Sequence, residues 1–239
     1  MSDQVALIGV VVVPLLGALA VMLAGSRPNL REAMSLGAGV VLLALVVRLL
    51  PRVLSGDWPA TVLAEPIPGL SLAFSAEPLG VLFGLIASFL WIVTTVYSIG
   101  YMRGHGEAHQ TRFYAFFAIA MGCTMGVAFA DNLFTLFVFY ELLTLSTYPL
   151  VTHAGTREAR QGGRIYLGIL MATSMGFLLL AVVWTWQLAG NLRFTSGGIL
   201  AGAASPLVIG VLFALYVFGI GKAALMPFHR WLPAAMVAP

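Results

Sequence analysis

Long apolar runs alternate with short polar segments along the whole chain. A helix needs roughly 20 apolar residues to cross a hydrocarbon core of about 30 Å, and seven runs are close to or above that length. The runs are apolar on all sides, which predicts membrane-spanning α-helices and not the alternating strands of a β-barrel. The fold class predicted is an all-α polytopic membrane protein with seven transmembrane helices. The predicted spans are Val5–Ala24, Ala33–Leu50, Leu79–Tyr101, Phe113–Ala130, Leu133–Val151, Ile165–Ala189 and Leu207–Leu225.

Segment 51–78 is the long loop between the second and third spans. It holds prolines at positions 51, 59, 66, 68 and 78, which forbid a continuous helix. Two strand-like stretches, 61–63 and 70–74, flank the turn residues 66–69. This arrangement predicts a small hairpin on the outer face of the membrane.

The composition agrees with a protein whose solvent is a bilayer. Of 239 residues, 60% are hydrophobic and 9% are charged, whereas a soluble domain carries about 25% charged residues. One cysteine excludes a disulfide framework, a four-cysteine zinc site and a Cys-ligated iron–sulfur cluster held by this chain alone. No histidine lies in the middle of a span to bind haem, and no phosphate-binding glycine loop is present. The sequence therefore predicts no cofactor, no metal site and no redox centre. The net charge of +3 is small and scattered, which argues against nucleic acid as a partner.

The arginines predict the orientation of the spans, because basic residues are retained on the cytoplasmic side. The opposite loops carry Arg52 and Arg193, with Arg48 at the end of the second span. This asymmetry predicts an N-terminus on the outer side of the membrane. The arginines on the predicted inner side are Arg27, Arg31, Arg103, Arg112, Arg157, Arg160, Arg164 and Arg230.

Glu141 and Lys222 are the two charged residues that lie well inside an apolar run. A charge at such a depth costs at least about 2.5–3.5 kcal/mol, and it commonly marks an ion or proton pathway. Glu141 is near the middle of its span, and Thr144 and Tyr148 share its face of the helix. The alternative interpretation of Glu141 is a protonated side chain in a structural hydrogen bond.

Lys222 lies in a segment that is unsuited to a continuous helix. Gly219, Gly221 and Pro227 weaken the backbone hydrogen bonds around it, and broken membrane helices commonly form ion-binding sites. The alternative is a lysine that extends to the membrane surface from a helix end. His153 and His229 lie near the predicted cytoplasmic ends of spans, where they could supply protons or serve as interface anchors.

Four motifs connect these charges to a known family. They are Tyr97–Met102 (YSIGYM), Asn132–Phe134 (NLF), Phe139–Val151 (FYELLTLSTYPLV) and Gly221–Met236 (GKAALMPFHRWLPAAM). In these motifs the chain resembles the antiporter-like subunits shared by respiratory complex I, Mrp-type cation/proton antiporters and membrane-bound hydrogenases. The stretch around Tyr140-Glu141 looks most like the D-type subunit of the Mrp antiporters. The chain departs from the family pattern at Tyr140, where Trp is frequent, and at Ala234, where an acid is usual.

The resemblance implies a fold of about fourteen helices that contains two inverted five-helix repeats. This chain would hold an incomplete antiporter-like fold, without the end of the first repeat and without the second. The division that follows is residues 1–112 for helices one to three and residues 113–239 for the partial first repeat. Truncation, a split subunit and a fragment are equally compatible with this length.

The resemblance also implies a function. Glu141 and Lys222 would transfer protons in a subunit of a cation/proton antiporter or a complex I-like assembly, of the NADH:quinone oxidoreductase type. The implied partners are other membrane subunits, a separate C-terminal half if the gene is split, and H⁺, with Na⁺ left open. One alternative is a non-transporting half-subunit that braces such a complex. A remote alternative is a retinal-binding seven-helix protein, against which the third span counts because it has no carboxylate to serve as counter-ion.

Overall fold

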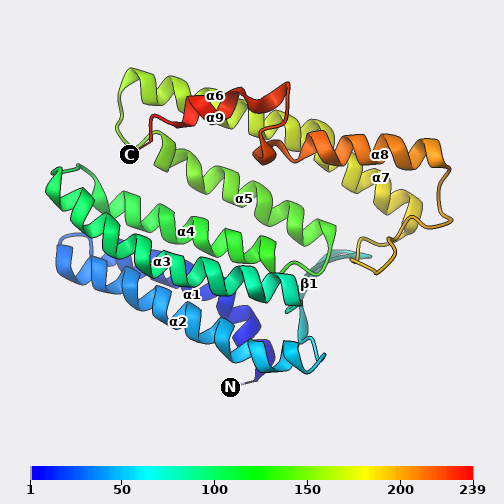
Figure 1. The fold of residues 1–239 in the computed structure, drawn as a ribbon, viewed down its shortest axis with the longest axis horizontal. Helices are drawn as coiled ribbons and strands as arrows, with labels where there is room; N and C mark the ends of the chain where they lie inside the picture. Colours follow the sequence, from blue (N-terminus) through cyan, green and yellow to red (C-terminus); the bar gives the residue numbers. More distant parts are fainter. Residues whose placement is uncertain (1, 239) are drawn as a thin grey trace. The chain divides into compact units, whose positions relative to one another are not determined.

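The computed structural model describes residues 2–238, and helices dominate it (Figure 1). A π-helical turn, Ser174–Leu178, joins α6 to α7 without a break, and two 3₁₀ turns, Gly221–Ala223 and Phe228–Arg230, follow α8. The strands β1 (Ala60–Ile67) and β2 (Leu70–Ser75) pair as the hairpin that the sequence predicts. The α-helices are α1 (Asp3–Leu23), α2 (Pro28–Leu54), α3 (Pro78–Gly104), α4 (Gln110–Ala128), α5 (Leu133–Val151), α6 (Arg157–Thr173), α7 (Leu179–Ala189), α8 (Pro206–Gly219) and α9 (Trp231–Ala235).

Within residues 2–238, six helical segments are long and apolar enough to cross a membrane. These are α1 to α5 and the continuous segment Arg157–Ala189. The predicted seventh span, Leu207–Leu225, is α-helical only through α8, whose 14 residues extend about 21 Å. The count of seven full-length spans is therefore reduced to six plus a shorter apolar helix, because the backbone leaves the α-helical conformation at Gly219.

The chain divides into two compact units. The N-terminal unit contains residues 1–61 and 74–130, and the C-terminal unit contains residues 62–73 and 131–239. Packing places α4 with α1 to α3, so this division falls at residues 130/131. The division predicted at residues 112/113 concerns the repeats of the family fold, which packing alone does not define.

Small residues let the helices of the N-terminal unit approach closely. A Cβ at Gly17 would lie 2.6 Å from that of Ala38, which brings α1 against α2. A Cβ at Gly122 would lie 3.0 Å from Leu15 and 3.2 Å from the carbonyl oxygen of Val11, which brings α4 against α1. In the sequence, small residues recur at every fourth position in the fourth span (Ala118, Gly122, Gly126 and Ala130) and in the sixth (Gly168, Ala172 and Gly176), which predicts close helix packing. The stripe in the fourth span is used for such packing.

A buried ionic network joins α2, α3 and α4 at one end of the N-terminal unit. The Glu32 carboxylate is 6% exposed, and it accepts hydrogen bonds from Arg103 at 2.9 and 2.5 Å and from Arg31 at 3.3 Å. Arg31 also donates to Gln110 at 2.7 Å and lies over the ring of Tyr114. Because the charges are paired, the network can hold the helix ends together without isolating a charge from water.

Within the C-terminal unit, the hairpin fixes the beginning of α5. The Asn132 side chain caps the helix by accepting from the amide of Thr135 at 2.8 Å, and it donates to the carbonyl of Ser71 at 2.9 Å. The Thr135 hydroxyl accepts from the amide of Ala73 at 2.9 Å. These bonds set the position of α5 along its axis, and hence the position of Glu141 two turns further on.

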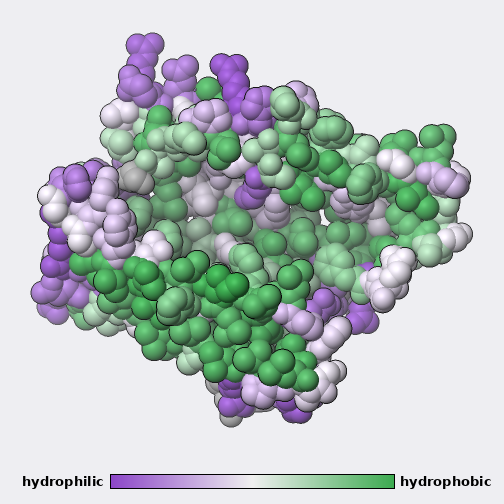
Figure 2. Space-filling model, viewed as in Figure 1, coloured by the Kyte–Doolittle hydropathy of each residue, from purple (hydrophilic) through white to green (hydrophobic). Residues whose placement is uncertain are grey.

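The surface carries large apolar side chains over much of its area. Figure 2 shows a broad hydrophobic surface over the helices of the N-terminal unit. Monomeric soluble proteins rarely expose apolar patches of this extent, whereas a bilayer makes them favourable. Strongly exposed members include Leu16, Met22, Leu23, Leu82, Phe89, Val96 and, in the C-terminal unit, Leu180 and Phe213.

Candidate functional site

Helix α5 carries the buried acid of the C-terminal unit. Glu141 is 7% exposed, and Thr144, one turn further on the same face, is fully buried. Neither carboxylate oxygen of Glu141 has a hydrogen-bond partner among residues 2–238. A buried carboxylate without hydrogen bonds is energetically costly, so the position is better explained by a function than by stability.

A second segment, residues 219–224 at the end of α8, lies near the part of α5 that carries Glu141. Helix α8 ends at Gly219, and Ala224 takes a left-handed conformation with φ of 52°. A Cβ at Gly219 would lie 2.6 Å from the backbone nitrogen of Leu178, and a Cβ at Gly221 would overlap the Thr173 hydroxyl. Both glycines therefore allow a close approach that no other residue would permit. The Trp231 indole holds the turn by donating to the carbonyl of Gly221 at 2.8 Å.

Lys222 lies in this turn and extends to α5. Its ammonium donates to the Tyr140 carbonyl at 3.1 Å and to the Thr144 hydroxyl, and it lies 3.8 Å from the centre of the Tyr140 ring. The Tyr140 hydroxyl in turn accepts from the backbone amide of Lys222 at 3.1 Å. Tyr140 and Thr144 flank Glu141 on α5, so the structure brings the lysine to the acid across 81 residues of sequence.

The π-helical turn between α6 and α7 completes the surroundings of Glu141. The Ser174 hydroxyl and the Lys222 ammonium are near enough to act on the Glu141 carboxylate electrostatically. Ser174 is fully buried, and its hydroxyl makes one long bond of 3.3 Å to the Met171 carbonyl. π-Helical turns occur frequently at functional sites. The sequence interpretation did not single out Ser174, although Thr173-Ser174 is a polar pair inside an otherwise apolar run.

The other predicted polar residues lie at different depths. Tyr148 is half-buried and packs beside Gly163 of α6. His153 is buried just beyond the end of α5, at 4% exposure. His229 is exposed in the 3₁₀ turn Phe228–Arg230. Of the supporting residues expected from the sequence, Thr144 is the one in contact with Lys222.

Gly219→Ala tests whether the break of α8 depends on close backbone contact. The added methyl group would overlap the backbone of Leu178, so we expect the free energy of unfolding to fall by roughly 1–3 kcal/mol. Gly210→Ala on the same helix is the matched control, because a Cβ there meets nothing within 4 Å. The control should leave stability unchanged or raise it by up to about 1 kcal/mol. Thermal unfolding in detergent measures both, and equal stabilities of the two variants would contradict the packing argument.

No group of three or more His, Cys, Asp or Glu side chains that could hold a metal ion occurs within residues 2–238. The groups that the described site offers are one carboxyl, one amine and several hydroxyls. Such groups bind and release protons or hold cations through oxygen atoms. A buried acid beside a lysine at a helix break, in a chain with six long apolar helices, defines a polytopic membrane protein with a charged site between its helices.

Comparison with known proteins places this site in a family. Residues 130–239 match the family described as NADH:quinone oxidoreductase/Mrp antiporter, TM, and this segment, which contains Glu141 and Lys222, belongs to it. NADH-quinone oxidoreductase subunit N of Desulforudis audaxviator (strain MP104C) is 32% identical over 233 residues, which cover 95% of this chain and 46% of that protein.

Two solved structures share the fold. The membrane-bound sulfane sulfur reductase, an archaeal respiratory membrane complex, has a chain with a TM-score of 0.81 at 22% identity, covering 100% of this chain and 48% of that one. A chain of the Mrp complex from Dietzia sp. DQ12-45-1b has a TM-score of 0.78 at 23% identity, covering 98% and 44%. The antiporter-like fold expected from the sequence motifs is thus confirmed. The chain spans about half the length of these relatives.

Proposed function

We propose that this chain is a proton-conducting membrane subunit of a cation/proton antiporter or a complex I-like assembly, and that Glu141 and Lys222 transfer the protons. The observation that carries the proposal is the contact of the Lys222 ammonium with Tyr140 and Thr144, which flank the buried Glu141. The ammonium thus lies against the two residues that flank the acid on α5, at the break of α8. Placing ionisable groups inside a membrane costs free energy, and such groups commonly mark proton or ion pathways.

The proposed mechanism depends on how each charge affects the other. Burial disfavours the charged form of an ionisable group, and a nearby opposite charge favours it. While Glu141 is charged and close, it stabilises the protonated ammonium of Lys222. When Glu141 takes up a proton or moves away, that support is lost and Lys222 releases its proton. The pair would then act as a switch that neighbouring subunits can control electrostatically.

Hydroxyl groups near the pair are suitable for carrying protons to and from it. The Thr147 hydroxyl lies 2.6 Å from that of Tyr166, between Glu141 and the end of α5 where His153 is buried. The Thr185 hydroxyl lies 2.7 Å from that of Tyr216, between α7 and α8. These groups support a polar route through the C-terminal unit, because hydroxyls both donate and accept hydrogen bonds.

The proposal also names the partner subunits, the transported ion and the membrane of this chain. Its partners would be other membrane subunits of a hetero-oligomeric complex, including the second half of the fold if another chain supplies it. The transported ion would be H⁺, with or without exchange for Na⁺, in the cell membrane of a prokaryote. Proton flux into vesicles that contain the assembled complex tests the function, because loss of either charge should lower flux at least about tenfold while assembly continues. Assembly with undiminished flux would leave the chain as a structural brace.

Cysteine labelling tests the proposed orientation, with the N-terminus outside. Ser2 and Gln161 are exposed, and the single native cysteine, Cys123, is buried and can be replaced by alanine. In intact cells, a reagent that cannot cross the membrane should label Ser2→Cys and leave Gln161→Cys unlabelled. After the cells are broken, both should react. Labelling of Gln161→Cys alone in intact cells would reverse the orientation.

A further inference from the structure

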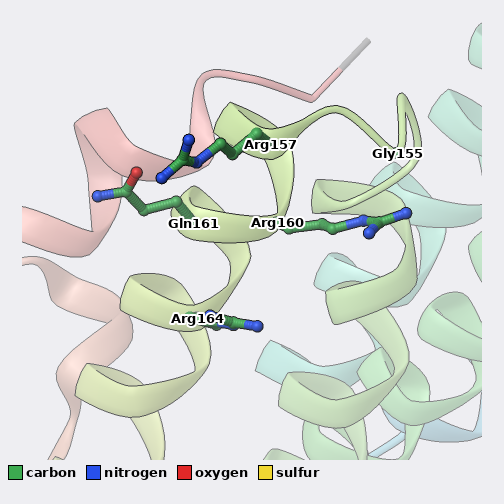
Figure 3. Close-up of a pocket in the computed structure, with 5 residues that line it drawn as sticks. All are labelled: Gly155, Arg157, Arg160, Gln161 and Arg164. Atoms are coloured by element: carbon green, nitrogen blue, oxygen red, sulfur yellow. The ribbon is translucent and has the colours of Figure 1, made fainter.

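Three arginines and a glutamine project from the first two turns of α6 and line a surface hollow. Arg157, Arg160, Gln161 and Arg164 surround it together with Gly155, and its volume is about 590 Å³ (Figure 3). Arg160 and Arg164 extend toward the side on which Gly155 lies, whereas Arg157 and Gln161 extend to the other side (Figure 3). The proton-transfer proposal does not use this hollow.

The three arginines share two turns of α6, and their guanidinium groups have no acidic partners among the described residues. None of them forms an ion pair within residues 2–238, whereas Arg31, Arg48, Arg52, Arg103 and Arg193 all do. Glu158 is the acidic residue in the first turn of α6, so the local charge stays positive. Guanidinium groups bind phosphate through paired hydrogen bonds, and clustered arginines are typical of phosphate recognition.

The length of the α6–α7 segment predicts that the arginines lie at the level of phospholipid phosphates. The continuous helical segment Arg157–Ala189 has 33 residues, which extend about 50 Å, whereas a hydrocarbon core is about 30 Å thick. Residues 165–189 carry no charge, so Arg164 marks the edge of the apolar part. Arg157 lies about 10 Å further along the axis. The excess length therefore places the cluster in the headgroup layer.

Further along α6, toward its C-terminus, the face that carries the arginines has small and exposed residues. Gly168 and Ala172 continue the row of Arg157, Arg160 and Arg164 at helical spacing, and both are exposed. A Cβ at Gly168 would meet nothing within 4 Å. The small-residue stripe predicted for the sixth span is thus not used here to pack α6 against another described helix. A phosphate-binding cluster that continues into a shallow apolar strip suits a lipid better than a free anion.

We propose that Arg160 and Arg164 bind the phosphate of an anionic phospholipid, whose acyl chain follows Gly168 and Ala172, and that Arg157 adds to the positive charge of the site. This site requires only that α6 crosses the membrane. It is independent of proton transfer by Glu141 and Lys222.

Native mass spectrometry of the purified complex in a neutral detergent tests the site. The probes are phosphatidylglycerol and phosphatidylcholine with identical acyl chains, with inorganic phosphate as a competitor. The test variant is Arg157→Gln/Arg160→Gln/Arg164→Gln. The matched control, Arg48→Gln/Arg52→Gln/Arg193→Gln, removes the same three charges from arginines that already have acidic partners.

We expect the wild type and the control to retain phosphatidylglycerol in preference to phosphatidylcholine, and the test variant to lose on the order of tenfold or more of that preference. Millimolar inorganic phosphate should not displace the lipid. If the triple variant does not fold, Arg160→Gln/Arg164→Gln serves in its place, with the same expected direction.

Three results would overturn the proposal. An unchanged lipid preference in the test variant would place the lipid elsewhere. Displacement by inorganic phosphate would indicate a free-anion site. Loss of a partner subunit from the purified complex, with unchanged lipid preference, would assign the arginines to an acidic protein surface.

Discussion

Lys222→Met should reduce proton-coupled transport to the background leak of the vesicles while the complex still assembles. Methionine has a similar length and apolar volume, so packing should change little, but it has no proton to carry. The two hydrogen bonds that the ammonium donates to Tyr140 and Thr144 are lost, at about 1 kcal/mol each. Thr144 keeps its own bond to the Tyr140 carbonyl at 3.0 Å, so its hydroxyl remains satisfied. The measurement is proton flux in vesicles with equal amounts of assembled complex.

Lys222→Arg separates the need for a positive charge from the need for a transferable proton. The guanidinium remains protonated at any working pH, so this variant should also fail to transport. Recovery of flux in the arginine variant would show that charge alone is sufficient. Wild-type flux in the methionine variant would make Lys222 an anchor and the chain a brace.

Glu141→Gln should also lower proton flux, by about tenfold or more, because one proton-transfer group is lost. Glutamine has nearly the same shape as glutamate, but it cannot take up and release a proton at neutral pH. Both carboxylate oxygens are buried without hydrogen bonds among the described residues, so removing the charge removes a desolvation cost. Glutamine also withdraws the opposite charge that favours the Lys222 ammonium, so the two effects offset each other and we expect the free energy of unfolding to change by less than about 1 kcal/mol. Flux assays and thermal unfolding of the same preparation provide the two measurements.

Ser146→Ala is the matched control for Glu141→Gln on α5. Ser146 is also buried, and its hydroxyl donates to the Leu143 carbonyl in its own helix, at 2.9 Å. Its replacement should leave the flux near that of the wild type. A large loss of stability in Glu141→Gln, with flux lost in proportion to the folded fraction, would favour the structural interpretation of this residue.

The sequence predicted the long membrane helices and drew attention to two charges within apolar runs, because both follow from the energetics of the bilayer. Apolar runs of about 20 residues have few alternatives to membrane helices, and a charge inside such a run is rare enough to be informative. Gly219 and Gly221 predicted where α8 would become irregular. The length of α8 was less predictable. Leu207–Leu225 is apolar almost throughout, and only the backbone conformation at Gly219 ends the helix.

Contacts between distant segments were beyond sequence reasoning. Nothing in the spacing of Tyr140 and Lys222 shows that the lysine would contact both ends of the tyrosine. The π-helical turn at Ser174 has no simple sequence signature. Glu32 looks like a solvated charge at a span end, yet its carboxylate is buried and paired with the half-exposed Arg103. The two small-residue stripes were equivalent in sequence, but Gly122 packs against α1 while Gly168 has open space.

The central claim is that Glu141 and Lys222 titrate as one coupled unit, and infrared spectroscopy of the reconstituted complex tests it most directly. The absorption of the protonated carboxyl group of Glu141 is assigned by its disappearance in Glu141→Gln and followed as a function of pH. If the two groups are coupled, Lys222→Met should move the midpoint of that titration by about one pH unit or more. Superimposable titrations of the wild type and Lys222→Met would contradict the charge pair.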